Sequence, residues 1–322
     1  MPVQTSNKSG LFSRIKPIFD TSILKDKRVT IIGLGTGGSL AAAALAKCGV
    51  RLFCFADFDI LELHNIIRHL CGLRDEGRHK TEAVKDFILN INPEVQIEVF
   101  NVDAVKNEAI MDKLIRGTDL LLVCTDTESS KYKINEYCIR LFYEEGVVIP
   151  TIYGGAYENA FGGDVMRVIP GETPCYDCVV GTVQKSESWE SRPQKKIVCG
   201  QLESAEDFKA EPGLGMDVHF IALIQAKFAL LTLLRGSESS LEDIPYNFLF
   251  WGNRREWIFE NPFERIFANI EKRNDCPTCS KWKSWNKGLK MTRRQVKKEA
   301  KTLLKKLPKA DLPGVPFPKT GK

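Results

Sequence analysis

A glycine-rich turn between a strand and a helix constrains this chain more than any other feature. Residues 28–34 are a short β-rich apolar run, and residues 39–47 are strongly helix-forming. The turn between them follows the pattern G-x-G-x-x-G and contains Gly33, Gly35, Gly37 and Gly38. Glycines in this context let the backbone approach a phosphate, and the helix N-terminus supplies unpaired N–H groups. The turn therefore predicts a nucleotide site, and the alternative is a tight turn that holds no ligand.

Strands and helices alternate after this turn. Apolar runs and helical spacing predict strands over residues 52–56, 95–99, 120–124 and 147–152, and helices over residues 79–90 and 129–142. Such alternation is typical of a Rossmann-like, doubly wound and mostly parallel sheet in an α/β protein. Beyond residue 150 we expect shorter strands between glycines, an apolar helix over 216–234, and late strands over 248–251 and 256–259. These carboxy-terminal strands are expected to be antiparallel.

The composition fits a soluble globular protein. Of the 322 residues, 43% are apolar and 27% are charged, which argues against wholesale disorder. No uninterrupted apolar run reaches the roughly 18 residues that a membrane span needs. The first 25 residues lack the apolar block of a signal peptide. We therefore expect a cytoplasmic protein that makes no membrane contact.

The chain divides by composition into three parts. We expect an N-terminal segment over residues 1–26, a main domain over 27–282 with a polar loop at 184–212, and a basic tail over 283–322. Residues 281–322 carry a net charge of +12, whereas the residues before them carry −7. The tail docks an acidic partner protein, touches nucleic acid or is a solvated appendage. Because it has few aromatic residues, nucleic acid is disfavoured and partner docking is the interpretation we favour.

Carboxylates and cations follow the predicted strands. Asp57 lies 19 residues beyond Gly38 at the end of the second strand, where an acid accepts hydrogen bonds from a ribose. The glycine turn and this acid do not distinguish ATP from NAD. Arg68 and Lys80, with the amide of Asn65, come next along the chain.

A second carboxylate, Asp126, ends the fourth strand. Two cations, an amide and this carboxylate at strand ends predict a triphosphate-and-magnesium site, which a hydride-transfer enzyme does not need. Taken singly, Arg68 and Lys80 are equally read as surface cations, and Asp126 as a helix N-cap. Their joint spacing favours ATP and Mg²⁺.

Two C-x-x-C pairs are separated by 97 residues. They consist of Cys175, Cys178, Cys276 and Cys279. Four thiolates at this spacing suit a tetrahedral structural Zn²⁺, and the short loops direct backbone N–H groups at sulfur. A redox C-x-x-C is the alternative, but it would not require two copies. Because four thiolates close the coordination sphere, we expect no catalysis from this metal.

A further cysteine, Cys199, lies in the polar loop at 184–212. Its neighbours Lys195 and Lys196 both favour the thiolate. The other five cysteines lie in or beside apolar runs and are read as small core residues.

Six motifs recur in order over residues 12–280. Besides the glycine turn and the C-x-x-C pairs, they are Asp57-Phe-Asp59, Asn65-Ile-Ile-Arg68 with Lys80, Ile91-Asn-Pro93 and Cys124-Thr-Asp126. This series resembles the ThiF/MoeB/HesA adenylyltransferases, the bacterial relatives of ubiquitin-activating enzymes. The resemblance implies that ATP binds at the glycine turn and Asp57–Asp59, that Asn65, Arg68 and Lys80 contact its phosphates, and that Asp126 binds Mg²⁺.

The resemblance also implies a homodimer in which an N-terminal arginine enters the partner's site. The nearest counterpart is Arg14 in Phe12-Ser-Arg14, which is equally read as an ordinary surface arginine. In some family members a loop cysteine takes the activated acyl group, a role that falls to Cys199. The sequence departs from the family pattern at Thr36, His64, His69 and Thr127.

The function expected from these features is ATP-dependent adenylation of the C-terminal carboxylate of a ubiquitin-like or sulfur-carrier protein, followed by acyl transfer to Cys199. One alternative is adenylation of a peptide, a small carboxylate or tRNA. The others are a nucleotide-binding scaffold without turnover and an NAD-dependent oxidoreductase.

Overall fold

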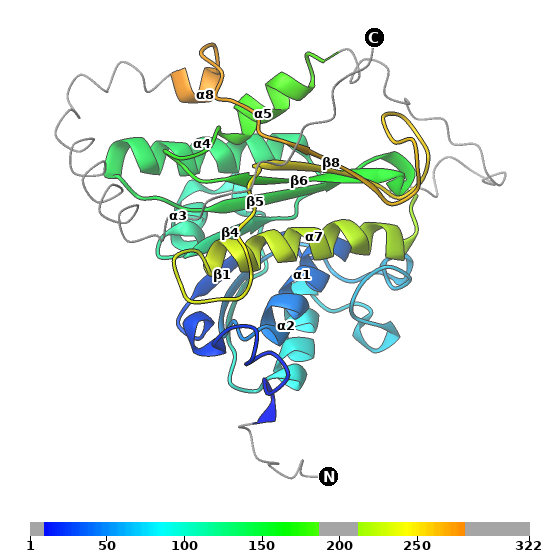
Figure 1. The fold of residues 1–322 in the computed structure, drawn as a ribbon. Helices are drawn as coiled ribbons and strands as arrows, with labels where there is room; N and C mark the ends of the chain where they lie inside the picture. Colours follow the sequence, from blue (N-terminus) through cyan, green and yellow to red (C-terminus); the bar gives the residue numbers. More distant parts are fainter. Residues whose placement is uncertain (1–9, 187–211, 281–322) are drawn as a thin grey trace, which may run out of the picture. The chain divides into compact units, whose positions relative to one another are not determined.

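The computed structural model describes residues 10–186 and 212–280, which all belong to one unit of the chain, residues 1–282 (Figure 1). The strands are β1 (Arg28–Ile32), β2 (Leu52–Ala56), β3 (Gln96–Phe100), β4 (Leu120–Val123), β5 (Thr151–Ala156), β6 (Gly162–Val168), β7 (Phe248–Gly252) and β8 (Glu264–Ala268). The helices are α1 (Thr36–Lys47), α2 (Lys80–Ile91), α3 (Glu108–Ile115), α4 (Glu128–Glu145), α5 (Tyr176–Val183), α7 (Gly215–Leu233) and α8 (Pro277–Ser280).

The eight strands form one mixed sheet in the order β3-β2-β1-β4-β5-β6-β7-β8. The first five strands of this order are parallel, and β6, β7 and β8 extend the sheet in antiparallel fashion. The expected fold class, a mostly parallel sheet with antiparallel carboxy-terminal strands, is confirmed. In a parallel sheet, ligands bind beyond the carboxyl ends of the strands, where β1 leads into α1.

Two apolar cores lie on opposite faces of the sheet because successive strand side chains point to opposite sides. On β1, Val29 and Ile31 join the core beneath α1, α2 and α7, whereas Ile32 joins the core beneath α3, α4 and α5. Figure 1 shows α1 and α7 side by side on one face and α4 on the other. Helices on both faces make the sheet doubly wound, as the alternation of elements predicted.

One expected strand is wrong. Residues 256–259 form a turn, and the last strand of the sheet is β8, which begins at Glu264. Trp257 has φ of 58°, a left-handed conformation that no strand residue adopts, and its ring packs edge-on against Tyr157 and Phe161. The apolar residues that suggested a strand therefore fill a local aromatic cluster.

Other strands and helices begin or end a few residues away from their predicted bounds. The strand expected over 147–152 begins at Thr151, where its pairing with β4 begins, and residues 147–150 belong to no regular element. Helices α3 and α5 were not predicted from the sequence.

Helix α7 is long and apolar enough, by length and composition alone, to cross a membrane. Half of its most apolar window is buried inside the protein, where the helix contacts α1, β5 and β6. The core helix of a globular protein passes the same test.

Candidate functional site

The glycine turn depends on two of its glycines for packing. Gly33 follows β1 with φ of 93°, and a Cβ there would lie 2.6 Å from the carbonyl oxygen of Cys124. A Cβ on Gly38 would lie 1.9 Å from the carbonyl oxygen of Gly33. Both positions therefore require glycine for the close approach of β1, α1 and the end of β4.

The other two glycines face open space. No described atom beyond its own neighbours lies within 4 Å of a Cβ built on Gly35, and a Cβ on Gly37 would meet only Ala222, at 3.9 Å. Gly35 caps α1 without a side-chain hydrogen bond, so the first backbone N–H groups of the helix keep their donor capacity. This cradle fits a phosphate, because it offers both room and unpaired donors at the positive end of a helix.

Asp57 holds the turn from the end of β2. Its Oδ2 accepts a hydrogen bond of 2.6 Å from the backbone N–H of Leu34, and its Oδ1 accepts one of 2.8 Å from the N–H of Asp59. Burial raises the pKa of this carboxyl group, and the two backbone hydrogen bonds act against that rise. Asp57 is therefore oriented by the backbone of the glycine turn and of Asp59, at the end of β2.

Asp59 and Lys80 form an ion pair beside it. The ammonium of Lys80, the first residue of α2, lies 2.7 Å from Oδ2 of Asp59. Lys80 is 8% exposed, so its charge is held at the edge of the sheet rather than in bulk solvent. The structure thus brings together three of the sequence-predicted residues, Asp57, Asp59 and Lys80.

Asn65 and Arg68 lie on the segment that connects β2 to α2. The side chain of Asn65 accepts a hydrogen bond of 3.0 Å from the N–H of Glu62, which closes a single turn over Leu63–Asn65. The carbonyl oxygen of Arg68 accepts a hydrogen bond of 2.9 Å from Nε2 of His219 on α7. Helix α7 therefore fixes the backbone of Arg68, whose side chain is half-buried.

Asp126 follows β4, the strand next to β1. It is exposed, and within residues 10–186 and 212–280 it makes no hydrogen bond or ion pair. The hydroxyl of its neighbour Thr125 is buried and also has no partner among the described residues. Next along the chain, Thr127 caps α4 by accepting a hydrogen bond from the N–H of Ser130. A free carboxylate beside an unpartnered hydroxyl fits a hydrated Mg²⁺ with its nucleotide.

Two polar residues that the sequence did not single out lie at the same edge. Lys131 on α4 is 7% exposed, and its ammonium pairs with Glu128 at 3.2 Å and lies against Gly155 at the end of β5. The amide of Gln225 on α7 donates to the carbonyl oxygens of Val123 and Ile152, both at 3.1 Å. Each is a polar residue on an otherwise apolar face of a helix, and this sequence pattern could have identified it.

Arg14 is not near this edge. It is exposed, and residues 10–15 line a cavity with Lys47 and Ile91, the last residues of α1 and α2. The glycine turn lies at the opposite end of α1, a helix about 18 Å long. Arg14 is therefore too far from the turn of its own chain to reach it. Cys199, most of the loop at 184–212 and the basic tail lie outside the described residues.

The four cysteines of the two C-x-x-C pairs converge, with all sulfur atoms within 4.8 Å of one another. Individual S···S distances are 3.6 Å for Cys175–Cys276, 3.9 Å for Cys178–Cys279 and 3.3 Å for Cys175–Cys279. A tetrahedral Zn²⁺ with Zn–S bonds of about 2.3 Å has S···S edges of about 3.8 Å. The donor set and the spacing of the cluster therefore fit a tetrahedral zinc ion.

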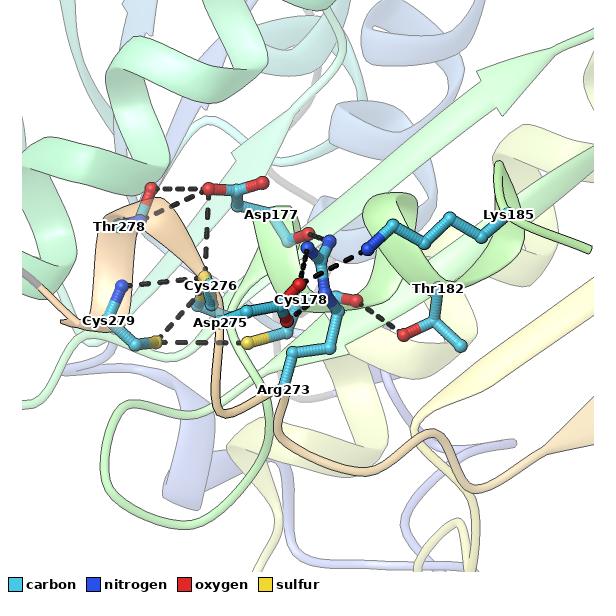
Figure 2. A network of polar contacts seen from close by, with 10 residues as sticks. Asp177, Cys178, Thr182, Lys185, Arg273, Asp275, Cys276, Thr278 and Cys279 are labelled. Carbon is cyan, nitrogen blue, oxygen red and sulfur yellow. Dashed lines mark hydrogen bonds and ion pairs between the residues drawn. The ribbon is translucent and has the colours of Figure 1, made fainter.

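Polar contacts orient the cluster, as Figure 2 shows. The N–H of Cys279 points to the sulfur of Cys276 at 3.4 Å, as the short loop predicted. Oδ2 of Asp177 accepts hydrogen bonds from the N–H and the hydroxyl of Thr278 at 3.2 and 2.9 Å, so it joins the two pairs. Arg273 contributes an ion pair with Asp275 on the outer side. Such outer contacts hold metal ligands in place.

Among similar proteins are ubiquitin-like modifier-activating enzyme 5 of Caenorhabditis briggsae, 30% identical over 58% of this chain and 44% of that protein, and the enzyme of the same name from Dictyostelium discoideum, 27% identical over 76% and 68%. The chain thus spans from less than half to about two thirds of the length of these curated relatives.

Similar solved structures include E. coli MccB with ATP, with a TM-score of 0.62 and 20% identity over 87% of this chain and 76% of that chain. PaaA has a TM-score of 0.54 and 19% identity over 79% and 67%. These likenesses concern the fold.

The model of the ThiF family matches residues 13–277, a span that includes the glycine turn, the acids at the strand ends and three of the four clustered cysteines, and ends two residues before Cys279. The resemblance in the motifs is therefore confirmed, and this chain belongs to the ThiF family.

Proposed function

We propose that this protein is an adenylyltransferase of the ubiquitin-activating type, which uses ATP to adenylate the C-terminal carboxylate of a ubiquitin-like protein. Family membership and the relatives named ubiquitin-like modifier-activating enzyme 5 support the use of ATP and a modifier as substrate. The observation that carries the proposal is the convergence of Gly33, Asp57, Lys80 and Asp126 beyond the carboxyl ends of β1, β2 and β4.

The reaction needs no general base, because a C-terminal carboxylate is already ionised near neutral pH. Its oxygen attacks the α-phosphorus of ATP, and the bond from that phosphorus to the bridging oxygen breaks. Pyrophosphate leaves with the electron pair, and the acyl adenylate remains.

The protein's task is to bring an anion to a polyanion. The N–H groups at the start of α1 would hold phosphate oxygens, while Lys80 and Arg68 would balance the charge that gathers on them. Asp126 would hold Mg²⁺, which when bound neutralises part of the triphosphate charge. Loss of one such preorganised charge typically costs about 2.7–4 kcal/mol of transition-state stabilisation.

We further propose a homodimer in which Arg14 of one protomer serves the site of the other. The position of Arg14 at the far end of α1 from its own turn supports a role in trans. Exposed apolar side chains beside Arg68 supply a surface for contact, with Ile67 86% exposed and Leu214 and Met216 also exposed.

A mixing experiment tests this arrangement. Arg14→Ala and Asp126→Ala proteins, each inactive alone, are mixed and allowed to exchange subunits. If Arg14 acts in trans, half of the dimers carry one intact site, and activity returns to about a quarter of the wild-type value. Absence of any recovery from proteins that native mass spectrometry shows to have formed mixed dimers would exclude Arg14 in trans.

Acyl transfer to Cys199 is proposed on the sequence alone. Its thiolate would attack the acyl adenylate, a thioester would form and AMP would leave with the electron pair. Cys199→Ser should retain pyrophosphate exchange and lose a thiol-sensitive protein adduct, with Cys48→Ser as the matched control. An unchanged adduct would remove Cys199 from the reaction.

ATP–pyrophosphate exchange is the test of the whole proposal. The purified protein is assayed against small ubiquitin-like proteins that end in Gly or Gly-Gly, beside Asp126→Ala and the matched variant Asp26→Ala. Asp26 is an exposed acid that precedes β1, at the edge of the sheet opposite the site. Exchange that requires one modifier, survives in Asp26→Ala and is lost in Asp126→Ala supports the proposal.

Exchange with a short peptide but with no modifier would favour the second candidate, a peptide adenylyltransferase. The likeness in fold to MccB, a structure solved in complex with N-formylated MccA, is the observation behind that candidate. If the protein binds no ATP at all, both proposals are wrong.

A further inference from the structure

We propose that His69 is a positioning residue for the nucleotide turn and that it does this work only as the neutral imidazole with its proton on Nε2. The inference rests on the proposed function in one respect, that the turn at Gly33–Gly38 binds ATP. It adds a residue that holds the turn and a protonation state in which the turn is competent.

The contacts of His69 reach the centre of the turn. Its Nε2 lies 2.8 Å from the carbonyl oxygen of Leu34, and its Nδ1 lies 3.0 Å from the backbone N–H of Cys71. The N–H of the same Leu34 donates to Oδ2 of Asp57 at 2.6 Å. Both backbone polar groups of Leu34, which lies between Gly33 and Gly35, are therefore fixed by side chains from the next part of the chain.

The partners determine the tautomer. The carbonyl oxygen of Leu34 can only accept a hydrogen bond, so Nε2 must donate. The backbone N–H of Cys71 can only donate, so Nδ1 must accept. Only the neutral ring with a proton on Nε2 satisfies both contacts. Since His69 is 7% exposed, water does not readily replace either of them.

A second proton on the ring would oppose the N–H of Cys71 with another donor. Burial is the largest cause that lowers the pKa of His69, and the positive charge of Lys80 on α2 lowers it further. The hydrogen bond to Leu34 and the carboxylate of Asp75 act in the opposite direction. The surroundings thus favour the neutral ring that the geometry requires. When acid protonates Nδ1 of His69, its hydrogen bond with the N–H of Cys71 is lost.

Glutamine is the side chain that separates these effects. Its amide can donate from nitrogen to Leu34 and accept at oxygen from Cys71, but it does not titrate. Leucine fills similar space and makes neither contact. His64→Gln is the matched control, because His64 lies on the same segment with its side chain about half exposed and paired with Glu62.

The experiment measures ATP binding by calorimetry between pH 5 and pH 8 for the wild type, His69→Gln, His69→Leu and His64→Gln. At pH 7.5 we expect His69→Gln to bind within about threefold of the wild type and His69→Leu to bind at least about tenfold more weakly. As the pH falls through the pKa of His69, which burial holds below its ordinary value of 6.5, ATP binding by the wild type should weaken relative to that by His69→Gln. Titration of the nucleotide itself is common to all four proteins and cancels in the comparison.

Nitrogen NMR of histidine-labelled protein gives an independent reading, since the chain has only four histidines. The ring signals that disappear in His69→Gln should show a neutral ring with the proton on Nε2, and they should keep that pattern at a pH where an ordinary imidazole is protonated. This reading remains available if His69→Leu fails to fold.

Each outcome decides. Equal pH profiles for the wild type and His69→Gln, or a proton on Nδ1 at pH 7, would overturn the role of His69. Wild-type protein that binds no ATP would instead overturn the proposed function, while the NMR pattern would still report whether His69 holds Leu34.

Discussion

The hydroxyl of Tyr176 donates a hydrogen bond of 2.7 Å to Oε2 of Glu128. Tyr176 lies between two of the clustered cysteines, and Glu128 begins α4 two residues after Asp126. The backbone N–H of Tyr176 also donates to Asn135 on α4, at 3.0 Å. Helix α5, which begins after Cys175 and contains Cys178, is therefore tied to α4, the helix that follows the candidate magnesium ligand.

Removal of that hydroxyl should affect the site more than the fold. In Tyr176→Phe we expect a loss of about 1 kcal/mol of stability, because the carboxylate of Glu128 is half exposed and can be hydrated again. Pyrophosphate exchange should need more Mg²⁺ for half-saturation, because the start of α4 beside Asp126 is less restrained. Tyr132→Phe, whose ring packs edge-on against Tyr176, is the control. Identical Mg²⁺ dependence in all three proteins would contradict the link.

The cysteine cluster should contain one zinc ion per chain, measurable by mass spectrometry of the purified protein. Replacement of one ligand, in Cys276→Ser, should lower the free energy of unfolding by roughly 3 kcal/mol or more and the Tm by about 6–12 °C. Cys48→Ser, outside the cluster, should retain both zinc and stability. If the wild-type protein contained no zinc and the Tm of Cys276→Ser equalled that of the wild type, the cluster would not be a metal site.

The two pairs of glycines should respond differently to alanine. In Gly38→Ala the new Cβ meets a backbone oxygen, so we expect a loss of stability on the order of 3 kcal/mol. In Gly37→Ala the Cβ enters open space within a helix, so the Tm should be unchanged or higher while ATP binding weakens. Thermal unfolding and calorimetry on both variants test the contrast. A Gly37→Ala protein with wild-type ATP affinity would show that no ligand approaches this side of the turn.

Lys80 should matter for turnover and little for folding. Since Asp59 is about half exposed, Lys80→Met leaves no buried unpaired charge, and we expect a stability change of about 1 kcal/mol or less. Pyrophosphate exchange should fall by about 10²–10³-fold. Lys85→Met on the same helix, which removes a partly exposed pair with Glu82, should leave exchange unchanged. Equal losses in both variants would remove Lys80 from the phosphate site.

The stability of the fold should depend on acid through His69. Its pKa is lower in the folded protein than its ordinary value of 6.5, so the unfolded chain binds the proton first as pH falls. The free energy of unfolding should therefore decrease below about pH 6.5 until the pKa of the folded state is reached. The Tm of the wild type should fall more than that of His69→Gln between pH 7 and pH 5. Parallel falls would show that other groups account for the acid sensitivity.

Much of the sheet was predictable because buried parallel strands give continuous apolar runs and glycine marks their ends. Strands β1, β2 and β4 and the helices beginning at Thr36 and Lys80 follow from that pattern, whereas β3, at the edge of the sheet, was predicted from the alternation of polar and apolar residues. The strand expected at 256–259 failed because Trp257, Ile258 and Phe259 are apolar for a tertiary reason, packing in a small aromatic cluster. Local periodicity does not distinguish a strand from such a turn.

The site was predictable where its residues stand at strand ends. Sequence spacing brought forward Asp57, Asp59 and Lys80, and it grouped the four cysteines that meet in the structure. It did not select Gln225, whose one signal was its polarity within an apolar helix, or Tyr176, because their roles depend on which helices lie against the strand ends. Partners that are about 50–100 residues apart are set by tertiary packing, which no local pattern contains.

The sulfur atoms of Cys178, Cys276 and Cys279 lie together in the cluster. The 97 residues between Cys178 and Cys276 therefore form a closed loop, which contains α7 and β7. A cross-link over about 100 residues removes about 4.7 kcal/mol of chain entropy from the unfolded state in the loop-closure model. Helix α7 lies within that loop and supplies both the amide that joins β4 to β5 and the imidazole that holds Arg68. A metal bound far from the reacting groups would thus influence the reaction by lowering the entropy of the unfolded state. Metal occupancy would set the fraction of molecules in which α7 is folded against the strand ends.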